Sequence, residues 1–121
     1  MNLWRAILYG ALSWVLIFFE VSILMFGLNL TGVTYYTIHY ILAAIIIAVT
    51  ATLYFSKKGT KAGLLSGLKV GIIFVAAGII LDVIITVPLF THTYTFFLDP
   101  LLILGFLEGI AVVMVIGALK K

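Results

Sequence analysis

The chain has 121 residues, of which 65% are hydrophobic and only 9% are charged. Soluble domains typically contain roughly 45–50% apolar and about 25% charged residues. A chain this short cannot hide the excess apolar surface in a water-soluble core, so the composition excludes a soluble globular protein and indicates a lipid environment. Cysteine is absent from the sequence, which excludes disulfides and thiolate metal sites.

Four apolar stretches are each long enough to cross a bilayer as an α-helix. About 20 residues at a rise of about 1.5 Å per residue match the thickness of the hydrocarbon layer. These stretches cover roughly residues 6–28, 38–56, 65–89 and 100–119. Because the spans and their short connections account for the whole sequence, we expect residues 1–121 to form a single all-α domain, a four-helix up-down bundle in the membrane.

Local signals predict where several helices begin and end. Asp99 followed by Pro100 predicts the start of the last helix, as an N-cap residue with proline at the first helical position. Lys57 and Lys58 predict the end of the second helix, because cations are favoured near a helix C-terminus. Pro88 removes a backbone donor, so we expect the third helix to end near it rather than to continue with a kink.

The basic residues predict the orientation of the bundle. All seven lie on one side of the predicted arrangement: Arg5, Lys57, Lys58, Lys61, Lys69, Lys120 and Lys121. By the positive-inside rule this side faces the cytoplasm, which predicts a multi-pass protein of the cell membrane with N-in and C-in termini. Because the charges sit at helix ends, the net charge of +3 does not indicate a nucleic-acid partner.

Aromatic side chains dominate the opposite, outer connections. They are Tyr35, Tyr36, Tyr40, Phe90, Tyr94, Phe96 and Phe97. This composition is typical of the headgroup level of a membrane protein. We therefore expect these residues to lie at the outer interface with the lipid bilayer.

A weak internal duplication is visible in the sequence. Residues 20–23 (EVSI) align with residues 82–85 (DVII), and each half ends with a pair of lysines. The alignment predicts two helical hairpins in parallel orientation. Chance similarity in a biased composition is the alternative interpretation.

Three of the four acidic residues, Glu20, Asp82 and Glu108, lie inside the predicted spans. Each is a similar number of residues from the nearest cytoplasmic basic residue, which places all three at one depth. Small residues stack on the same helix faces, and carboxyl groups avoid lipid, so we expect the three acids to point into the bundle. Lys and Arg do not occur at this depth, and we therefore expect the carboxyls to have no internal ion-pair partner.

Two functions are compatible with such a layer of carboxyl groups. The first is a small carrier, or a proton- or cation-binding protein, that uses Glu20, Asp82 and Glu108 with Ser13 and Thr86 as supporting polar groups. The alternative is a non-catalytic membrane assembly or accessory subunit, in which the carboxyls form hydrogen bonds between helices. Four short helices leave little room for a lumen, so we expect a homodimer, or another membrane protein as the partner.

Other kinds of chemistry find little support in the sequence. His39, His92 and Asp99 lie near the outer interface and could bind a transition metal. Their spacing matches no metal-binding motif, however, and we favour ordinary interfacial histidines and expect no metal and no cofactor. A phosphate-binding glycine loop, a nucleophile elbow and a catalytic triad are not found in the sequence, so we do not expect an enzyme.

The second half of the chain resembles small four-span prokaryotic membrane proteins of no assigned function. The similar segments are GIILDVIITVPLF (78–90), YTFFLDP (94–100) and GFLE (105–108). This resemblance implies no particular activity.

The small size, the four spans and Glu20 in the first span are also similar to the small multidrug resistance exporters. That similarity implies that Glu20 is the carboxylate that binds the proton and the cationic substrate. The chain departs from these exporters in its additional acids Asp82 and Glu108, in lacking aromatic-rich later spans, and in its complete charge bias. We therefore do not expect membership in that family.

Overall fold

The computed structural model describes residues 2–91 and 100–120, and within these ranges the chain is helical without strands. Its elements are α1 (Leu3–Ser22), the π-helix η1 (Ile23–Gly27), α2 (Gly32–Phe55), α3 (Leu64–Leu81), the π-helix η2 (Asp82–Thr91) and α4 (Pro100–Leu119). Four helical stretches are long and apolar enough to cross a membrane: Leu3–Gly27, Gly32–Phe55, Leu64–Leu89 and Leu102–Leu119. The predicted all-helical fold with four candidate spans is confirmed.

The second helix begins earlier than predicted. Thr31 is extended and Gly32 has a φ of +62°, and α2 starts directly after this turn rather than near residue 38. The early start places Tyr35 and Tyr36 within a helix rather than in an outer connection. The expectation of an interfacial loop was therefore wrong for the tyrosines of this helix. The reason is that the residues after Gly32 are compatible with a helix although they are less apolar than those further along it.

The other predicted helix ends agree in part with the structure. α4 begins at Pro100 as predicted, while Asp99 lies outside the described residues. α2 ends at Phe55, and Ser56 is its C-cap, so Lys57 follows the helix instead of lying in its last turn.

The third span agrees with the prediction, since the candidate span runs over Leu64–Leu89 and so ends next to Pro88. Its last part is the π-helix η2, which contains the proline and is described as far as Thr91. The wider turn and the shifted hydrogen bonds of a π-helix accommodate a residue without a backbone N–H. The first span also changes to π-helix in its last turn, at η1, so both membrane-spanning stretches that contain Glu20 and Asp82 lose α-helical geometry toward the same end of the bundle.

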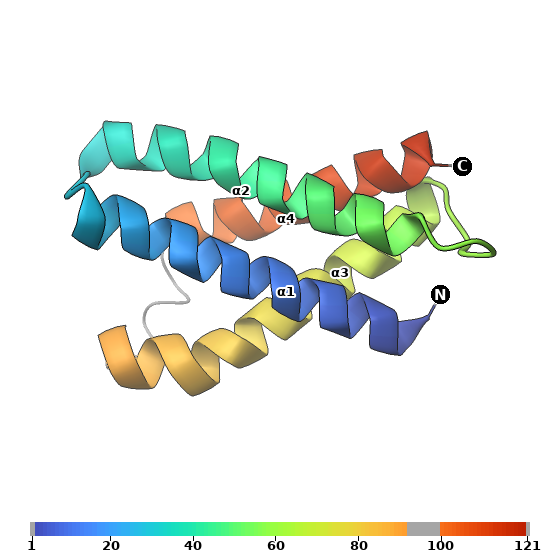
Figure 1. The fold of residues 1–121 in the computed structure, drawn as a ribbon, viewed down its shortest axis with the longest axis horizontal. Coiled ribbons are helices and arrows are strands. Elements are labelled where there is room, and N and C mark those ends of the chain that lie inside the picture. The colour runs from blue at the N-terminus through green and yellow to red at the C-terminus, as the bar shows by residue number, and fades with distance from the viewer. Residues whose placement is uncertain (1, 92–99, 121) are drawn as a thin grey trace.

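The helices are arranged around the bundle in the order α1, α2, α4, α3 (Figure 1). α1 packs on α2 and α3, and α4 packs on the same two helices, whereas α2 and α3 do not touch within the described residues. Consecutive helices α2 and α3 are therefore diagonal in the bundle. The hairpin of α1 and α2 lies against the hairpin of α3 and α4.

Glycines bring α3 and α4 close together at the end that carries the two termini (Figure 1). A Cβ atom on Gly67 would lie 2.7 Å from the Cα of Met114 and 2.8 Å from the carbonyl oxygen of Val113. The backbone N–H of Gly63 donates a hydrogen bond of 2.8 Å to the carbonyl of Gly117. Close approach of this kind is how membrane helices gain packing energy without a hydrophobic driving force.

We expect Gly67→Ala to destabilise the protein by about 1–3 kcal/mol, because the added methyl group meets backbone atoms that cannot move aside. The measurement is the free energy of unfolding in detergent micelles, by titration with a denaturing detergent. Gly27→Ala is the matched control, because its Cβ would meet only the Cγ2 of Ile23 at 3.9 Å. Equal stability of the two variants would contradict the close crossing.

Arg5 of α1 forms hydrogen bonds with the C-terminal end of α2. Its Nη2 donates hydrogen bonds of 3.3 Å to the carbonyl of Leu53 and 2.8 Å to that of Tyr54. The guanidinium also lies 5.2 Å from the ring centroid of Tyr9. A cation is favourable at this place because the last carbonyls of a helix carry partial negative charge.

Candidate functional site

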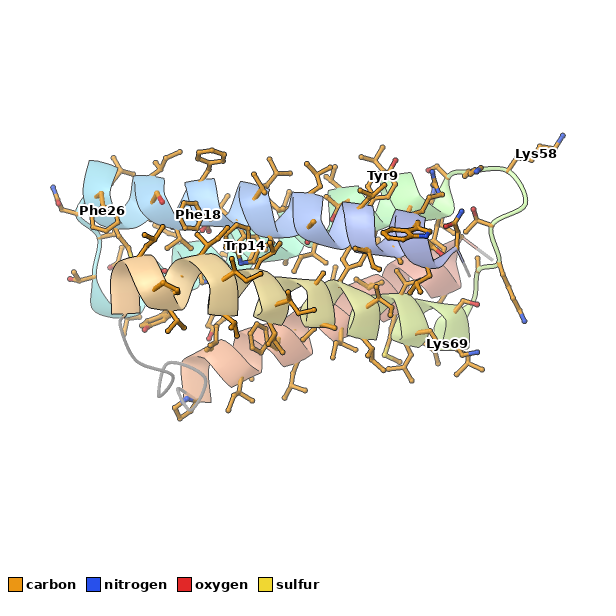
Figure 2. All side chains as sticks on the ribbon, turned by 90° about the horizontal axis from the view of Figure 1, so that it is seen from below. Tyr9, Trp14, Phe18, Phe26, Lys58 and Lys69 are labelled. Atoms are coloured by element: carbon orange, nitrogen blue, oxygen red, sulfur yellow. The ribbon has the colours of Figure 1, made fainter. Side chains whose placement is uncertain are left out.

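The half of the bundle away from the termini contains a cavity of about 540 Å³. Side chains from all four helices line it, and Trp14 of α1 lies between α1 and α3 (Figure 2). Its aromatic lining comprises Trp14, Phe18, Phe26, Tyr35, Tyr36, Tyr40, Phe74 and Phe106, and its ionisable lining comprises His39, Asp82 and Glu108. Three tyrosines that the sequence placed at the outer interface therefore line this cavity.

The cavity exists because the helices stand further apart here than at the other end. A Cβ atom on Gly78 would have only the Cδ1 atom of Trp14 near it, at 3.7 Å. A Cβ on Gly105 would meet only the ring of Tyr40, at 3.5 Å. Gly78 and Gly105 face side chains, whereas Gly67 faces the backbone of α4. The wider space between the helices at this end is occupied by large aromatic side chains, which do not fill it completely.

Glu20 of α1 is paired with His39 of α2. The Nδ1 atom of His39 lies 3.1 Å from Oε1 and 3.0 Å from Oε2 of Glu20. The two side chains are 7% and 19% exposed, respectively for Glu20 and His39. The expectation that no carboxyl has an internal partner was wrong, because it considered only Lys and Arg, whereas the partner is His39, about two turns inside α2.

The ring of His39 contacts Tyr35 as well as Glu20. It stacks on Tyr35 with a centroid distance of 5.5 Å and an interplanar angle of 5°. Both oxygens of Glu20 are nearly equidistant from Nδ1, which is the geometry expected when Nδ1–H donates to the carboxyl group.

Asp82 is held by two hydrogen bonds at the start of η2. Its Oδ1 accepts a bond of 2.8 Å from Nε1 of Trp14 and another of 2.8 Å from Oγ1 of Thr86. The residue is 8% exposed. Trp14 links α1 to η2 and was not identified from the sequence, although a buried indole N–H usually finds an acceptor and Trp14 lies within an apolar span.

Glu108 of α4 has an unsatisfied oxygen. Its Oε1 atom is buried and has no hydrogen-bond partner within the part of the chain that the structure describes. The imidazole of His39 is within electrostatic range of this carboxyl group. An unpaired buried acceptor costs free energy, so a donor supplied by a ligand would stabilise this site.

The three predicted acids surround one cavity. Asp82 and Glu108 line it, and Glu20 adjoins it through His39, which also lines it. Of the supporting groups, Thr86 binds Asp82, whereas Ser13 lines the cavity but donates to the carbonyl of Gly10 on its own helix.

The alternative metal site cannot be assembled from the described residues. His92 and Asp99 lie outside them, and His39 is engaged by Glu20. Within residues 2–91 and 100–120, no group of three metal-ligating side chains occurs.

The cavity is chemically suited to an organic cation with an apolar body. Lys and Arg do not contribute to its described lining, whereas carboxylates and aromatic faces do, and both attract cations. The volume of about 540 Å³ lies within the range of roughly 300–1,000 Å³ that is usual for small-molecule sites. Comparison of the chain with protein-family models, with curated proteins and with solved structures finds no match.

Proposed function

We propose that this protein is a small carrier or cation-binding protein of the cell membrane that takes an organic cation into the cavity among its four helices. Glu108 carries the proposal: its buried Oε1 has no hydrogen-bond partner among the described residues, and it lines an aromatic cavity. An ammonium group bound there would supply the missing donor and neutralise the carboxylate. Its apolar body would lie against the aromatic walls.

The proposal includes an up-down bundle with both termini on the cytoplasmic side. Lys58 and Lys69 lie at the end of the bundle that carries the termini, opposite Phe26 (Figure 2). The positive-inside rule supports a cytoplasmic location for that end. The cavity would then lie in the outer half of the membrane.

The other two carboxyls have different roles in this proposal. Asp82 is oriented by Trp14 and Thr86 and offers a second, fixed acceptor on the opposite wall of the cavity. Glu20 holds His39 in place, and the ring of His39 lines the same cavity as Glu108. Exchange of a proton for a cation is the chemistry that a layer of ionisable groups inside a membrane can support.

We expect phenylbutylammonium to bind more tightly than phenylbutanol and phenylbutyrate, which have the same skeleton but are neutral and anionic. Glu108→Gln should weaken binding of the ammonium compound roughly tenfold to a hundredfold, because a charge-assisted hydrogen bond is lost. Binding of the alcohol should change little. The measurement is Trp14 fluorescence in phosphatidylcholine vesicles, after Trp4→Phe has removed the other of the two tryptophans.

Trp4 is 75% exposed at the far end of α1, so its replacement leaves the cavity intact. Equal affinity for the three compounds, or an equal loss for the ammonium compound and the alcohol in Glu108→Gln, would contradict recognition of charge by Glu108.

A second candidate function is supported by the paired acids. The Glu20–His39 pair connects α1 to α2, and the Trp14–Asp82 bond connects α1 to η2. Such bonds suit an assembly or accessory subunit that binds a second copy or another membrane protein. In that case Glu108 would meet a donor from the partner, and Glu108→Gln would weaken co-purification of the complex instead of ligand binding.

A further inference from the structure

We infer that the cation reaches Glu108 from the lipid, through a lateral opening between α2 and α4. This inference rests on the proposed function and adds the class of ligand, namely amphiphilic amines that partition into the bilayer. It concerns the route into the cavity, so it can fail while the proposed binding site stands.

A second hollow on the side of α4 carries the inference. It is lined by Tyr40, Leu104, Leu107, Glu108 and Ala111. The side chains of Leu104 and Leu107 are 54% and 58% exposed, so this hollow faces the surroundings of the bundle, which in the membrane is lipid. Tyr40 and Glu108 line both this hollow and the central cavity. These two side chains therefore form the partition between the lipid side and the interior.

The partition is thin because α4 has glycines where it faces α2. A Cβ atom on Gly105 would lie 3.5 Å from Cε1 of Tyr40, and one on Gly109 would lie 3.3 Å from Cδ1 of Ile47. α4 thus contributes no side chain of its own at these two positions. The ring of Tyr40 lies over Gly105 instead.

The position of Glu108 at this partition determines which ligands can use the route. A strongly hydrated inorganic cation is excluded from the hydrocarbon layer by its desolvation cost. An amine with an apolar body accumulates in the membrane. Its cationic head would be stabilised by a carboxylate between the lipid and the cavity. Glu108, which lines both the hollow and the central cavity, provides this carboxyl group at the point where the ligand leaves the lipid.

The test compares Ala111→Phe with Ala118→Phe, both on the Trp4→Phe background. Ala111 lines the hollow but not the cavity, and Ala118 is an exposed residue further along the same helix that lines neither. In Ala111→Phe we expect association and dissociation of phenylbutylammonium to slow about tenfold, with an unchanged equilibrium affinity. Ala118→Phe should behave as the parent protein does. Stopped-flow Trp14 fluorescence in phosphatidylcholine vesicles measures both rates.

The outcomes separate the route from the function. If the parent protein does not bind phenylbutylammonium, both the proposed function and the proposed route are contradicted. If the parent protein binds and both alanine variants show its rates, the lateral route is overturned while the binding site stands. Slower rates in Ala111→Phe alone support the route.

Discussion

Replacing His39 with leucine is expected to destabilise the protein by about 3–5 kcal/mol, because it leaves the buried carboxylate of Glu20 without its partner. The Nδ1 atom of His39 lies 3.0 Å from Oε2 of Glu20, within contact distance of an ion pair. An ordinary hydrogen bond between membrane helices contributes only about 0.6 kcal/mol. The size of the loss therefore distinguishes a buried ion pair from simple interhelical hydrogen bonding.

The double variant Glu20→Leu/His39→Leu provides the control. With both partners replaced by apolar groups, no charge is left unpaired, and we expect stability within about 1 kcal/mol of the parent protein. We would measure the free energy of unfolding in detergent micelles for both single variants and the double variant. Together with the parent protein these values form a double-mutant cycle. If His39→Leu and the double variant were equally destabilised, the loss would come from packing of the imidazole against Tyr35 and not from the ion pair.

The fold could be predicted from the sequence because its signal is local. The length and apolarity of each span, and Pro100 at the start of α4, depend on neighbouring residues only. The order of the helices around the bundle could not be predicted, because it depends on which helix faces meet. Gly67, for example, contacts the backbone of α4 at Met114, and nothing in its local sequence identifies that partner. The π-helical geometry of η2 could not be predicted either, since an apolar sequence does not distinguish π-helical from α-helical hydrogen bonding.

The candidate site could be predicted only in part. The three acids were identifiable because charged groups in apolar spans are rare and avoid lipid. Their partners were missed for two separate reasons. His39 was placed near the outer interface, and only Lys and Arg were considered as partners for the acids. Trp14 lies on α1, and its pairing with Asp82 required knowing that α1 packs on α3, which sequence alone does not show.

Filling the cavity from Gly78 should abolish most ligand binding without unfolding the protein. Gly78 lines the cavity, and a Cβ there would have the edge of Trp14 at 3.7 Å and no backbone atom within 4 Å. The ring of Gly78→Phe would extend into the space beside Asp82, where the body of the ligand is proposed to lie. We expect at least about tenfold weaker binding of phenylbutylammonium, since a fixed side chain competes for the same volume.

Gly71→Phe is the matched control on the same helix. A Cβ atom on Gly71 would lie 3.1 Å from Cα and 3.3 Å from the carbonyl oxygen of Ile110, so a phenyl group there must force α3 and α4 apart. This variant should lose about 2 kcal/mol or more of stability through overpacking, whereas Gly78→Phe should remain close to the parent protein. Calorimetric titration measures binding, because the new ring at residue 78 would alter Trp14 fluorescence. Full affinity in a folded Gly78→Phe variant would place the ligand outside this cavity and would favour the assembly function, in which the interior needs no space for a small molecule.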